Sequence, residues 1–207
     1  MYMNSHIHYF LNLNIWWTYK KDECITFKST KGKYGALSNM APNLPLFISG
    51  HKILSAEALY QALRFPDRAD IQRNILGYKS PISAKNYARS VMDFNRPDWD
   101  RQRFAIMRFC IELKLYQHYD IFSNVLKSTS GYNIVEYTDK DKVWGAVEDG
   151  EYYVGTNALG RLLMELRENL LNGNFSLRIP NIPHLNFLGS PVTPERIDLP
   201  GVHDRLF

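Results

Sequence analysis

The spacing of apolar residues along the chain predicts a mainly helical protein with a few short strands. Apolar stripes at three- and four-residue intervals, with capping residues before them and proline or glycine after them, predict helices over residues 55–65, 80–92, 98–119, 121–127 and 157–173. β-Favouring runs predict strands over 23–27 and 133–137 and a hairpin over 47–54. The glycine-punctuated segment 138–156 is predicted to be a loop, and five prolines after Gly173 are expected to break any regular element.

Composition narrows the class of protein. The 207 residues are 45% hydrophobic and 22% charged, which is enough apolar material for a buried core and excludes a disordered or collagen-like chain. No apolar run approaches the roughly 20 residues of a membrane helix, and the first residues make a poor signal peptide. Two cysteines cannot form a disulfide framework, and the six histidines show no ligand spacing. We therefore expect a cytoplasmic protein without a metal, a cofactor or a membrane partner.

Positive charge is concentrated in the middle of the chain. The net charge is +4, and residues 60–120 hold eleven Lys or Arg against seven Asp or Glu, so 11 − 7 = +4 lies there. Solvated helix faces are the commoner explanation. The alternative is a surface that attracts phosphate-bearing partners, either an anionic metabolite or nucleic acid. No zinc-finger spacing or basic zipper is present, so no standard DNA-reading module is predicted.

The helix predicted over 55–65 carries an unusual polar stripe. Glu57, Tyr60, Gln61 and Arg64 stand at i, i+3, i+4 and i+7 and share one face. Glu57 also lies in the first turn, where the helix dipole favours an anion. Two interpretations stay open: a solvent-facing salt-bridge stripe, or a carboxylate that lines a cleft with Arg64 placed to hold a phosphate.

Lys114 has apolar or weakly polar neighbours one and two turns earlier on its helix, at Met107, Cys110 and Ile111. Such a lysine commonly buries its stem and keeps its ammonium in water. Alternatively the ammonium is desolvated, which lowers its pKa and supplies a nucleophilic amine near neutral pH.

Two further segments hold candidate binding residues. The stretch 136–145 is either an ordinary acidic loop or a loop that offers Trp144 as a stacking face for a flat ligand. The run Gly155–Gly160 places glycines and a capping Asn157 at a helix start, where free amides can hold a phosphate, although ordinary caps look the same. Trp99 is expected in the core or on a cleft wall.

Taken together, these motifs resemble the NADAR (YbiA-like) family. The resemblance runs from about Thr26 to Leu171 and rests on Phe27, Tyr34–Asn39, Ser55–Ala62, Ser80-Pro81, Ala84-Lys85, Arg96–Trp99, Met107, Leu113-Lys114, Val135-Glu136, Asp141, Trp144-Gly145 and Gly155–Arg167. One departure is Arg64, which stands where the family commonly has lysine. Because arginine keeps the cation but cannot form a Schiff base, we expect it to bind rather than react.

The resemblance implies a compact, mainly helical α+β single domain with a small sheet. It divides the chain into an N-terminal extension (1–25), a catalytic domain (26–172) and a proline-rich tail (173–207). It also implies an N-glycosidase that removes ADP-ribose from guanine in nucleic acid, or that cleaves phosphorylated ribosylamino-pyrimidines of riboflavin synthesis. The alternatives are a module that binds ADP-ribose or a nucleotide without cleaving it, and a scaffold for a toxin partner.

For the reaction, we expect Lys114 to attack ribose C1 while Glu57 or Asp141 moves protons. A rival route uses two carboxylates and water without a lysine adduct. Trp99 and Trp144 would stack on flat rings, and Arg64, Lys85 and Arg89 would contact phosphates. The other candidate binding residues are Asn39, Tyr60, Glu136, Gly145, Asn157 and Gly160. This hypothesis requires Glu57, Lys114, Asp141 and Trp144 to converge on one cavity.

Overall fold

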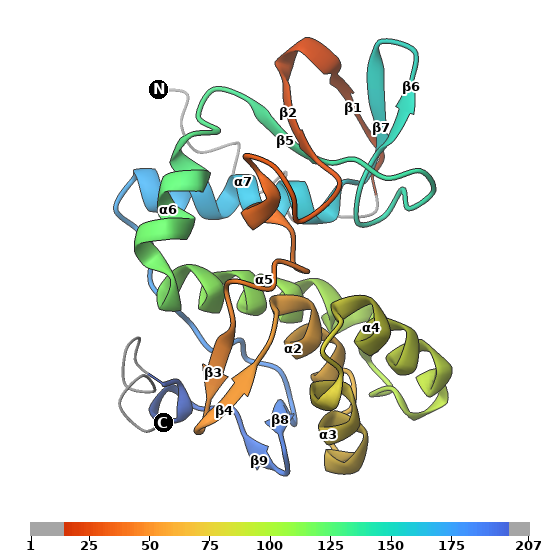
Figure 1. Cartoon of the computed structure of the whole chain (residues 1–207), viewed down its shortest axis with the longest axis vertical. Helices are drawn as coiled ribbons and strands as arrows, with labels where there is room; N and C mark the ends of the chain where they lie inside the picture. The colour runs from red at the N-terminus through yellow and green to blue at the C-terminus, as the bar shows by residue number, and fades with distance from the viewer. Residues whose placement is uncertain (1–14, 199–207) are drawn as a thin grey trace. The chain divides into compact units, whose positions relative to one another are not determined.

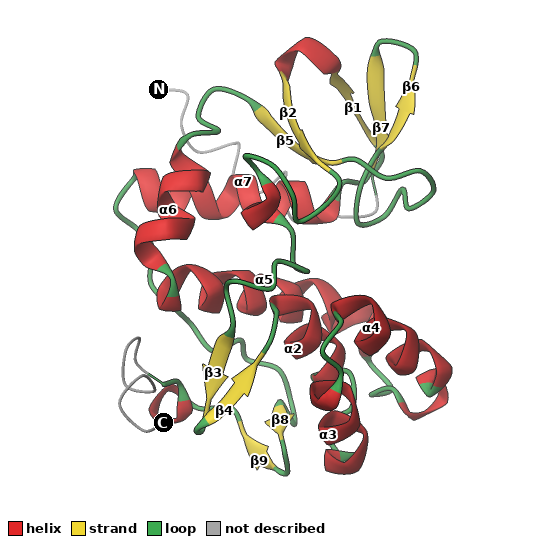
Figure 2. Cartoon of the chain, in the orientation of Figure 1, coloured by secondary structure: helices red, strands yellow, loops and turns green. Residues whose placement is uncertain are grey.

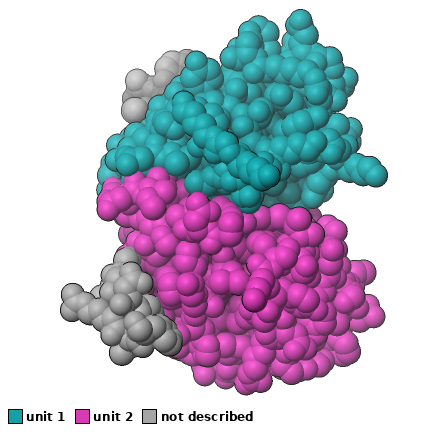
Figure 3. Space-filling model, viewed as in Figure 1, with its two compact units in different colours: residues 1–38, 123–175 teal, residues 39–122, 176–207 magenta. Residues whose placement is uncertain are grey.

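The computed structural model describes residues 15–198, which form two compact units. Of these, residues 15–38 and 123–175 belong to unit 1, and residues 39–122 and 176–198 belong to unit 2, as coloured in Figure 3. Each unit is therefore assembled from two separate stretches of the chain. The fold is α+β, as predicted, with the secondary structure drawn in Figure 2.

Unit 1 holds two small sheets and helix α7 (Figure 1). Its three-stranded antiparallel sheet has the order β1-β7-β6, formed by Trp17–Lys20, Tyr152–Gly155 and Val147–Asp149. A parallel pair joins β2 (Cys24–Phe27) to β5 (Asn133–Glu136). The unit also contains the 3₁₀ turns η1 (Lys21–Glu23) and η2 (Gly35–Leu37) and most of α6 (Tyr119–Lys127).

Helix α7 (Ala158–Leu171) packs directly on β5. A side chain at Gly160 would place its Cβ 2.1 Å from the carbonyl oxygen of Ile134, so only glycine allows this close approach. The Asn157 side chain completes the contact, because its Nδ2 donates to the Ile134 carbonyl (2.8 Å) and its Oδ1 accepts from the Glu136 N–H (3.0 Å).

Unit 2 is built around helix α2 (Ala56–Ala62), which packs against three other helices. These are α3 (Ala69–Gly77), α4 (Pro81–Ser90) and α5 (Trp99–Gln117). The unit also contains a hairpin, β3 (Leu46–Ile48) and β4 (His51–Ile53), the ladder β8 (Asn186–Phe187) and β9 (Ser190–Pro191), and the 3₁₀ turns η3 (Met92–Phe94) and η4 (Pro194–Arg196). Every residue of α2 is buried, because helices surround it.

The predicted helices, the strands at 23–27 and 133–137 and the hairpin are confirmed, with shifted ends. The loop predicted over 138–156 is partly wrong, since β6 and β7 lie within it, and α3 was not predicted at all. The tail is also more regular than expected: β8, β9 and η4 fall among its prolines, and Leu185, Phe187, Val192 and Ile197 are buried.

Candidate active site

Glu57 is the one fully buried carboxylate within residues 15–198, at 5% exposure. Its position follows from the start of α2, where the Ser55 hydroxyl accepts the Ala58 N–H (3.1 Å) as a cap. The Glu57 N–H donates to the carbonyl of Asn39 (2.9 Å). The solvent-facing interpretation of this stripe is therefore wrong. A carboxylate is seldom buried unless it is paired, so its contacts decide what it can do.

The Glu57 carboxylate belongs to a ladder of side-chain contacts along α2. Its Oε1 accepts from Nε2 of Gln61 (2.8 Å) and lies 3.9 Å from the Nζ of Lys85 on α4. The Oε1 of Gln61 accepts in turn from Nη1 of Arg64 (2.7 Å). Gln61 thus fixes the carboxylate and the guanidinium relative to each other, and both gain charge-assisted hydrogen bonds.

Arg64 is held on three sides. Its Nε donates to Oδ1 of Asn95 (3.1 Å), and its guanidinium carbon lies 4.9 Å from the ring centroid of Trp99. The ring of Trp99 in turn lies 5.1 Å from that of Tyr60. Burial lowers the pKa of the Arg64 guanidinium, and the nearby Arg89 charge acts in the same direction. Such a clamped guanidinium suits a fixed binding role better than a reacting one.

The charge balance of this cluster is positive. Lys85 lies 3.9 Å from the Glu57 carboxylate, Arg64 interacts electrostatically with it, and Arg89 adds a third cation near Arg64. Within the described residues, two of the five N–H donors of Arg64 have hydrogen-bond partners. A cluster with excess positive charge and spare donors can bind a phosphate.

Lys114 on α5 is the one fully buried lysine in the described part of the chain, at 1% exposure. Burial lowers its pKa from the ordinary 10.5 to about 7, although its Nζ lies 4.3 Å from the centroid of the Phe122 ring, which favours the ammonium. The interpretation in which its ammonium reaches water is therefore wrong. Burial therefore favours the neutral amine of Lys114 over its ammonium.

Glu57 and Lys114 are linked through α5, because α2 packs on this helix. The pKa of the Cys110 thiol is raised well above its usual range, first by burial and then by the charge of Glu57. Cys110 lies one helical turn before Lys114, at i and i+4. The charge of Glu57 is therefore felt at Cys110, one helical turn from the amine, whereas burial alone accounts for the lowered pKa of Lys114.

Asn39 is a buried residue of unit 2 whose side-chain oxygen could accept a hydrogen bond from a ligand. It is buried, and its Nδ2 donates to the sulfur of Met107 (2.9 Å). Its Oδ1 has no hydrogen-bond partner among the described residues. An unsatisfied buried acceptor is costly, and a ligand that donates a hydrogen bond would satisfy it.

The remaining predicted residues lie in unit 1, at the loop before β6 and the start of α7. Oδ1 of Asp141 accepts the N–H groups of Val143 (3.0 Å) and Trp144 (2.9 Å), so this carboxylate folds the loop that presents the half-buried Trp144. A side chain at Gly145 would place its Cβ 2.3 Å from the carbonyl oxygen of Glu136. Asp141 and Gly145 therefore have evident structural roles here.

The phosphate cradle predicted at the start of α7 is wrong. The backbone N–H groups of residues 156–159 already donate to the carbonyls of residues 142–145, at 2.7–3.1 Å. Asn157 does stand at the N-cap, with φ of 49°, but its side chain makes no capping bond and is engaged by β5. Asn157 binds the N–H of Glu136 and the carbonyl of Ile134, and Gly160 lets α7 pack closely on β5. Glu136, Asn157 and Gly160 therefore stabilise the contact between α7 and β5 in unit 1.

The structure brings together Glu57, Tyr60, Arg64, Lys85, Arg89 and Trp99 in unit 2, with Lys114 and Asn39 in the same unit. Glu136, Asp141, Trp144, Gly145, Asn157 and Gly160 belong to unit 1. Their convergence with Glu57 and Lys114 on one cavity stays a prediction. Gln61 and Asn95 also belong to this cluster, although neither was predicted as a site residue. The i+4 spacing from Glu57 could have indicated Gln61, whereas Asn95 comes from a distant loop.

The described residues offer neither a membrane-spanning helix nor a cluster of metal ligands. None of the helices between residues 15 and 198 combines the length and apolar character that crossing a bilayer requires. Over the same residues, no three His, Cys, Asp or Glu side chains gather as a group that could hold a metal ion.

Comparison with known proteins places the chain in a family. The model of the NADAR domain matches residues 26–171. N-glycosidase YbiA of Escherichia coli (strain K12) is 35% identical over 153 residues, which are 72% of this chain and 90% of that protein. A riboflavin biosynthesis protein of Vibrio vulnificus is 32% identical over 149 residues, which are 72% of this chain and 39% of that longer protein.

A solved structure agrees. The NMR structure of E. coli YbiA matches with a TM-score of 0.63 and 31% identity, covering 78% of this chain and 93% of that one. The chain belongs to the NADAR (YbiA-like) family of N-glycosidases, which are hydrolases that act on N-glycosyl bonds.

Proposed function

We propose that this protein hydrolyses the bond between ribose C1 and an exocyclic amine of a base, in a substrate that carries a phosphate on the sugar. The observation that carries this proposal is the buried Glu57 carboxylate, which is held by Gln61, lies 3.9 Å from Lys85 and is connected through Gln61 to Arg64, with Arg89 near that guanidinium. The cations would bind the phosphate, and the carboxylate would transfer protons at C1 of the sugar.

Lys114 supplies the nucleophile. Once the ribosylamine opens to an imine, the neutral Lys114 amine adds to C1, and the C1–N bond to the base then breaks. Both protons of the attacking amine pass to the leaving nitrogen, carried by the Glu57 carboxylate. The products of this exchange are the free base amine and an imine between C1 and Lys114.

Water completes the reaction. It adds to C1 of the lysine imine, its oxygen stays on the sugar, and its two protons return to Lys114 through Glu57. The sum is substrate plus water giving the base amine plus the free phosphorylated sugar, which is ribose phosphate or ADP-ribose according to the substrate, with no change of oxidation state. Glu57 is ionised at the start and at the end, and Lys114 is neutral at both, which fits a pKa of about 7.

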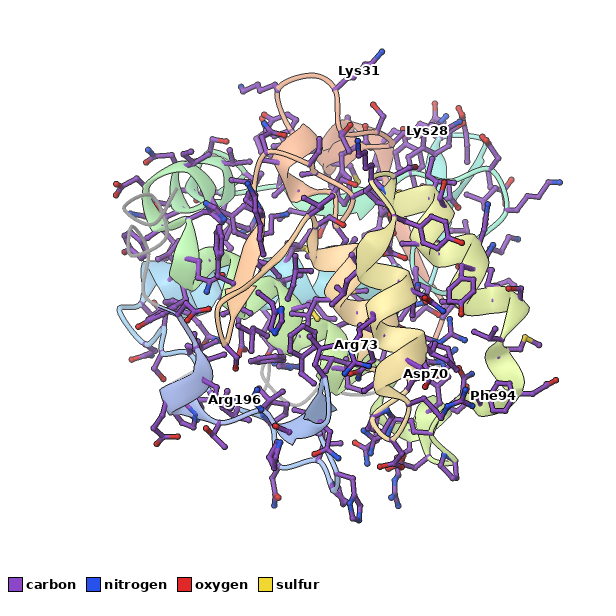
Figure 4. All side chains as sticks on the ribbon, turned by 60° about the horizontal axis from the view of Figure 1, so that its bottom comes forward. Lys28, Lys31, Asp70, Arg73, Phe94 and Arg196 are labelled. Carbon is purple, nitrogen blue, oxygen red and sulfur yellow. The ribbon has the colours of Figure 1, made fainter. Side chains whose placement is uncertain are left out.

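Of the two substrate classes, ADP-ribosylated guanine in nucleic acid is the first candidate. Unit 2 contains residues 60–120, where eleven Lys or Arg stand against seven Asp or Glu, and the exposed cations among them would attract a polyanion. Arg73 stands on α3, as Figure 4 shows, and is exposed, as are Lys79 and Arg89. The second candidate is a phosphorylated ribosylamino-pyrimidine, which the name of the Vibrio relative favours.

A side-by-side hydrolysis assay tests the proposal. The purified chain is given guanine-modified DNA and the ribosylamino-pyrimidine phosphate, and release of the free base is followed for each. We expect turnover of at least one, with the DNA preferred by kcat/KM. No base release from either would contradict the proposed function, and a preference for the pyrimidine would reverse the choice of substrate.

Gln61 offers a sharper test of the ladder. Replacing it by methionine keeps the volume but removes both hydrogen bonds, so Glu57 and Arg64 lose their shared anchor. We expect kcat to fall about 10- to 100-fold and KM to rise, since a catalytic group and a phosphate contact are both misplaced.

The matched control is Gln72→Met, another buried glutamine of unit 2. Gln72 donates to the carbonyls of Ala62 and Asn186, so its loss should lower the melting temperature with a smaller change in kcat. If Gln61→Met turned over substrate like the wild type, the ladder would have no role in the reaction.

A further inference from the structure

A segment that precedes the NADAR match forms part of unit 1. Strand β1 pairs antiparallel with β7, in the register Trp17↔Gly155 to Lys20↔Tyr152, and the Lys21 N–H donates to the Glu151 carbonyl (3.0 Å). The family model begins only at residue 26. Strand β1 therefore lies before the matched residues and forms an edge of the β1-β7-β6 sheet.

The residue before this strand is an exposed tryptophan. Trp16 is 60% exposed, and the Nζ of Lys142 lies 4.8 Å from the centroid of its ring. Lys142 forms no ion pair among the described residues. An exposed indole offers a flat apolar face and the nearby ammonium a positive charge, a combination that suits an aromatic partner carrying a phosphate.

The pair formed by Trp16 and Lys142 lies at the loop that holds the predicted site residues Asp141 and Trp144. Lys142 follows Asp141 in the loop that presents Trp144, and its carbonyl accepts the Thr156 N–H (2.7 Å). A substitution of the Lys142 side chain leaves that backbone contact intact. The loop is therefore tied to the start of α7, and Trp16 contacts it through the Lys142 ammonium.

We propose that Trp16 and Lys142 form a nucleotide subsite, in which the indole stacks on a nucleobase and the ammonium contacts its phosphate. The inference deepens the proposed function, on which it rests. The nucleotide could be a neighbour of the modified base in a single strand or the adenosine part of ADP-ribose. The shared chemistry is a flat base with an attached phosphate, which aromatic and basic residues together recognise.

Binding measurements test this without any scissile bond. The ligands are a fluorescent, unmodified single-stranded DNA oligonucleotide, followed by anisotropy, and ADP-ribose, followed by calorimetry. Trp16→Ala is expected to weaken binding of at least one of them about 5- to 150-fold, which corresponds to roughly 1–3 kcal/mol for one stacked base. Trp16→Phe should restore most of the affinity, and Lys142→Gln should reduce the salt dependence by about one phosphate contact.

The control is Tyr132→Ala, an exposed aromatic of the same unit that lies away from this loop in the sequence and should bind like the wild type. A loss for the oligonucleotide alone identifies a neighbouring nucleotide, and a loss for ADP-ribose alone identifies its adenosine. Unchanged binding of both ligands by Trp16→Ala, or a loss that phenylalanine does not restore, would overturn the subsite. Because neither ligand is cleaved, failure of the hydrolysis assay would not decide this result.

Discussion

Replacing Glu57 by glutamine is expected to lower kcat about 100- to 10,000-fold, the range for loss of a proton-transferring group. The amide has nearly the volume of the carboxylate, and its oxygen can still accept from Nε2 of Gln61. What disappears is the ability to take a proton and the attraction for Lys85, whose Nζ lies 3.9 Å away. The measurement is kcat for base release, with circular dichroism and thermal unfolding to verify the fold.

The matched control for this change is Glu195→Gln, the same substitution at an exposed site of unit 2. It should leave kcat unchanged, because surface substitutions away from special contacts have small effects. Wild-type turnover by Glu57→Gln would show that proton transfer does not pass through this carboxylate.

The second large effect is expected at Lys114, whose titration should make kcat/KM depend on pH. Since burial lowers its pKa to about 7, the fraction of neutral amine rises through neutrality. We expect kcat/KM to rise about tenfold per pH unit below 7 and to level off above it, and Lys114→Met to lose the activity. A pH profile of kcat/KM between pH 5 and 9 measures this. A flat profile over this range, or an active Lys114→Met variant, would contradict the role of the amine.

The same shift has a consequence for stability. Between about pH 7 and the ordinary pKa of 10.5, the unfolded chain holds a proton on Lys114 that the folded chain does not, so this residue makes stability rise with pH in that window. Below pH 7 the folded chain must bury the ammonium. The stability of Lys114→Met relative to wild type should therefore be greatest below pH 7 and decline toward pH 10.5. Lys127→Met, at an exposed lysine, should show no such trend.

Local signals explain which elements could be predicted. Ser55 and Ser80 both cap helices as expected, since their hydroxyls accept the N–H groups of Ala58 (3.1 Å) and Ser83 (3.4 Å). The hairpin could be predicted from the Ser49-Gly50 turn signal between two β-favouring runs. In the structure both residues adopt positive φ, 54° and 77°, as a tight hairpin turn requires. These features depend on residues close together in the sequence.

The elements that were missed lack such signals. Helix α3 begins after Arg68, whose side chain forms no cap, so no capping residue marks its start. In β6 and β7, Gly150 was interpreted as part of a loop, although it adopts φ of 56° in the turn of a hairpin. The burial of Glu57 could not be predicted either, because it depends on α3, α4 and α5 packing around α2.

Trapping the covalent intermediate tests the central claim most directly, namely that the Lys114 amine takes over ribose C1 with Glu57 as proton carrier. Borohydride added during turnover would reduce the imine, and mass spectrometry of the digested protein would locate the sugar. The account predicts an adduct on the peptide that contains Lys114, which is absent in Lys114→Ala and formed much more slowly in Glu57→Gln. Continued base release without any adduct, together with an active Lys114→Ala variant, would contradict it.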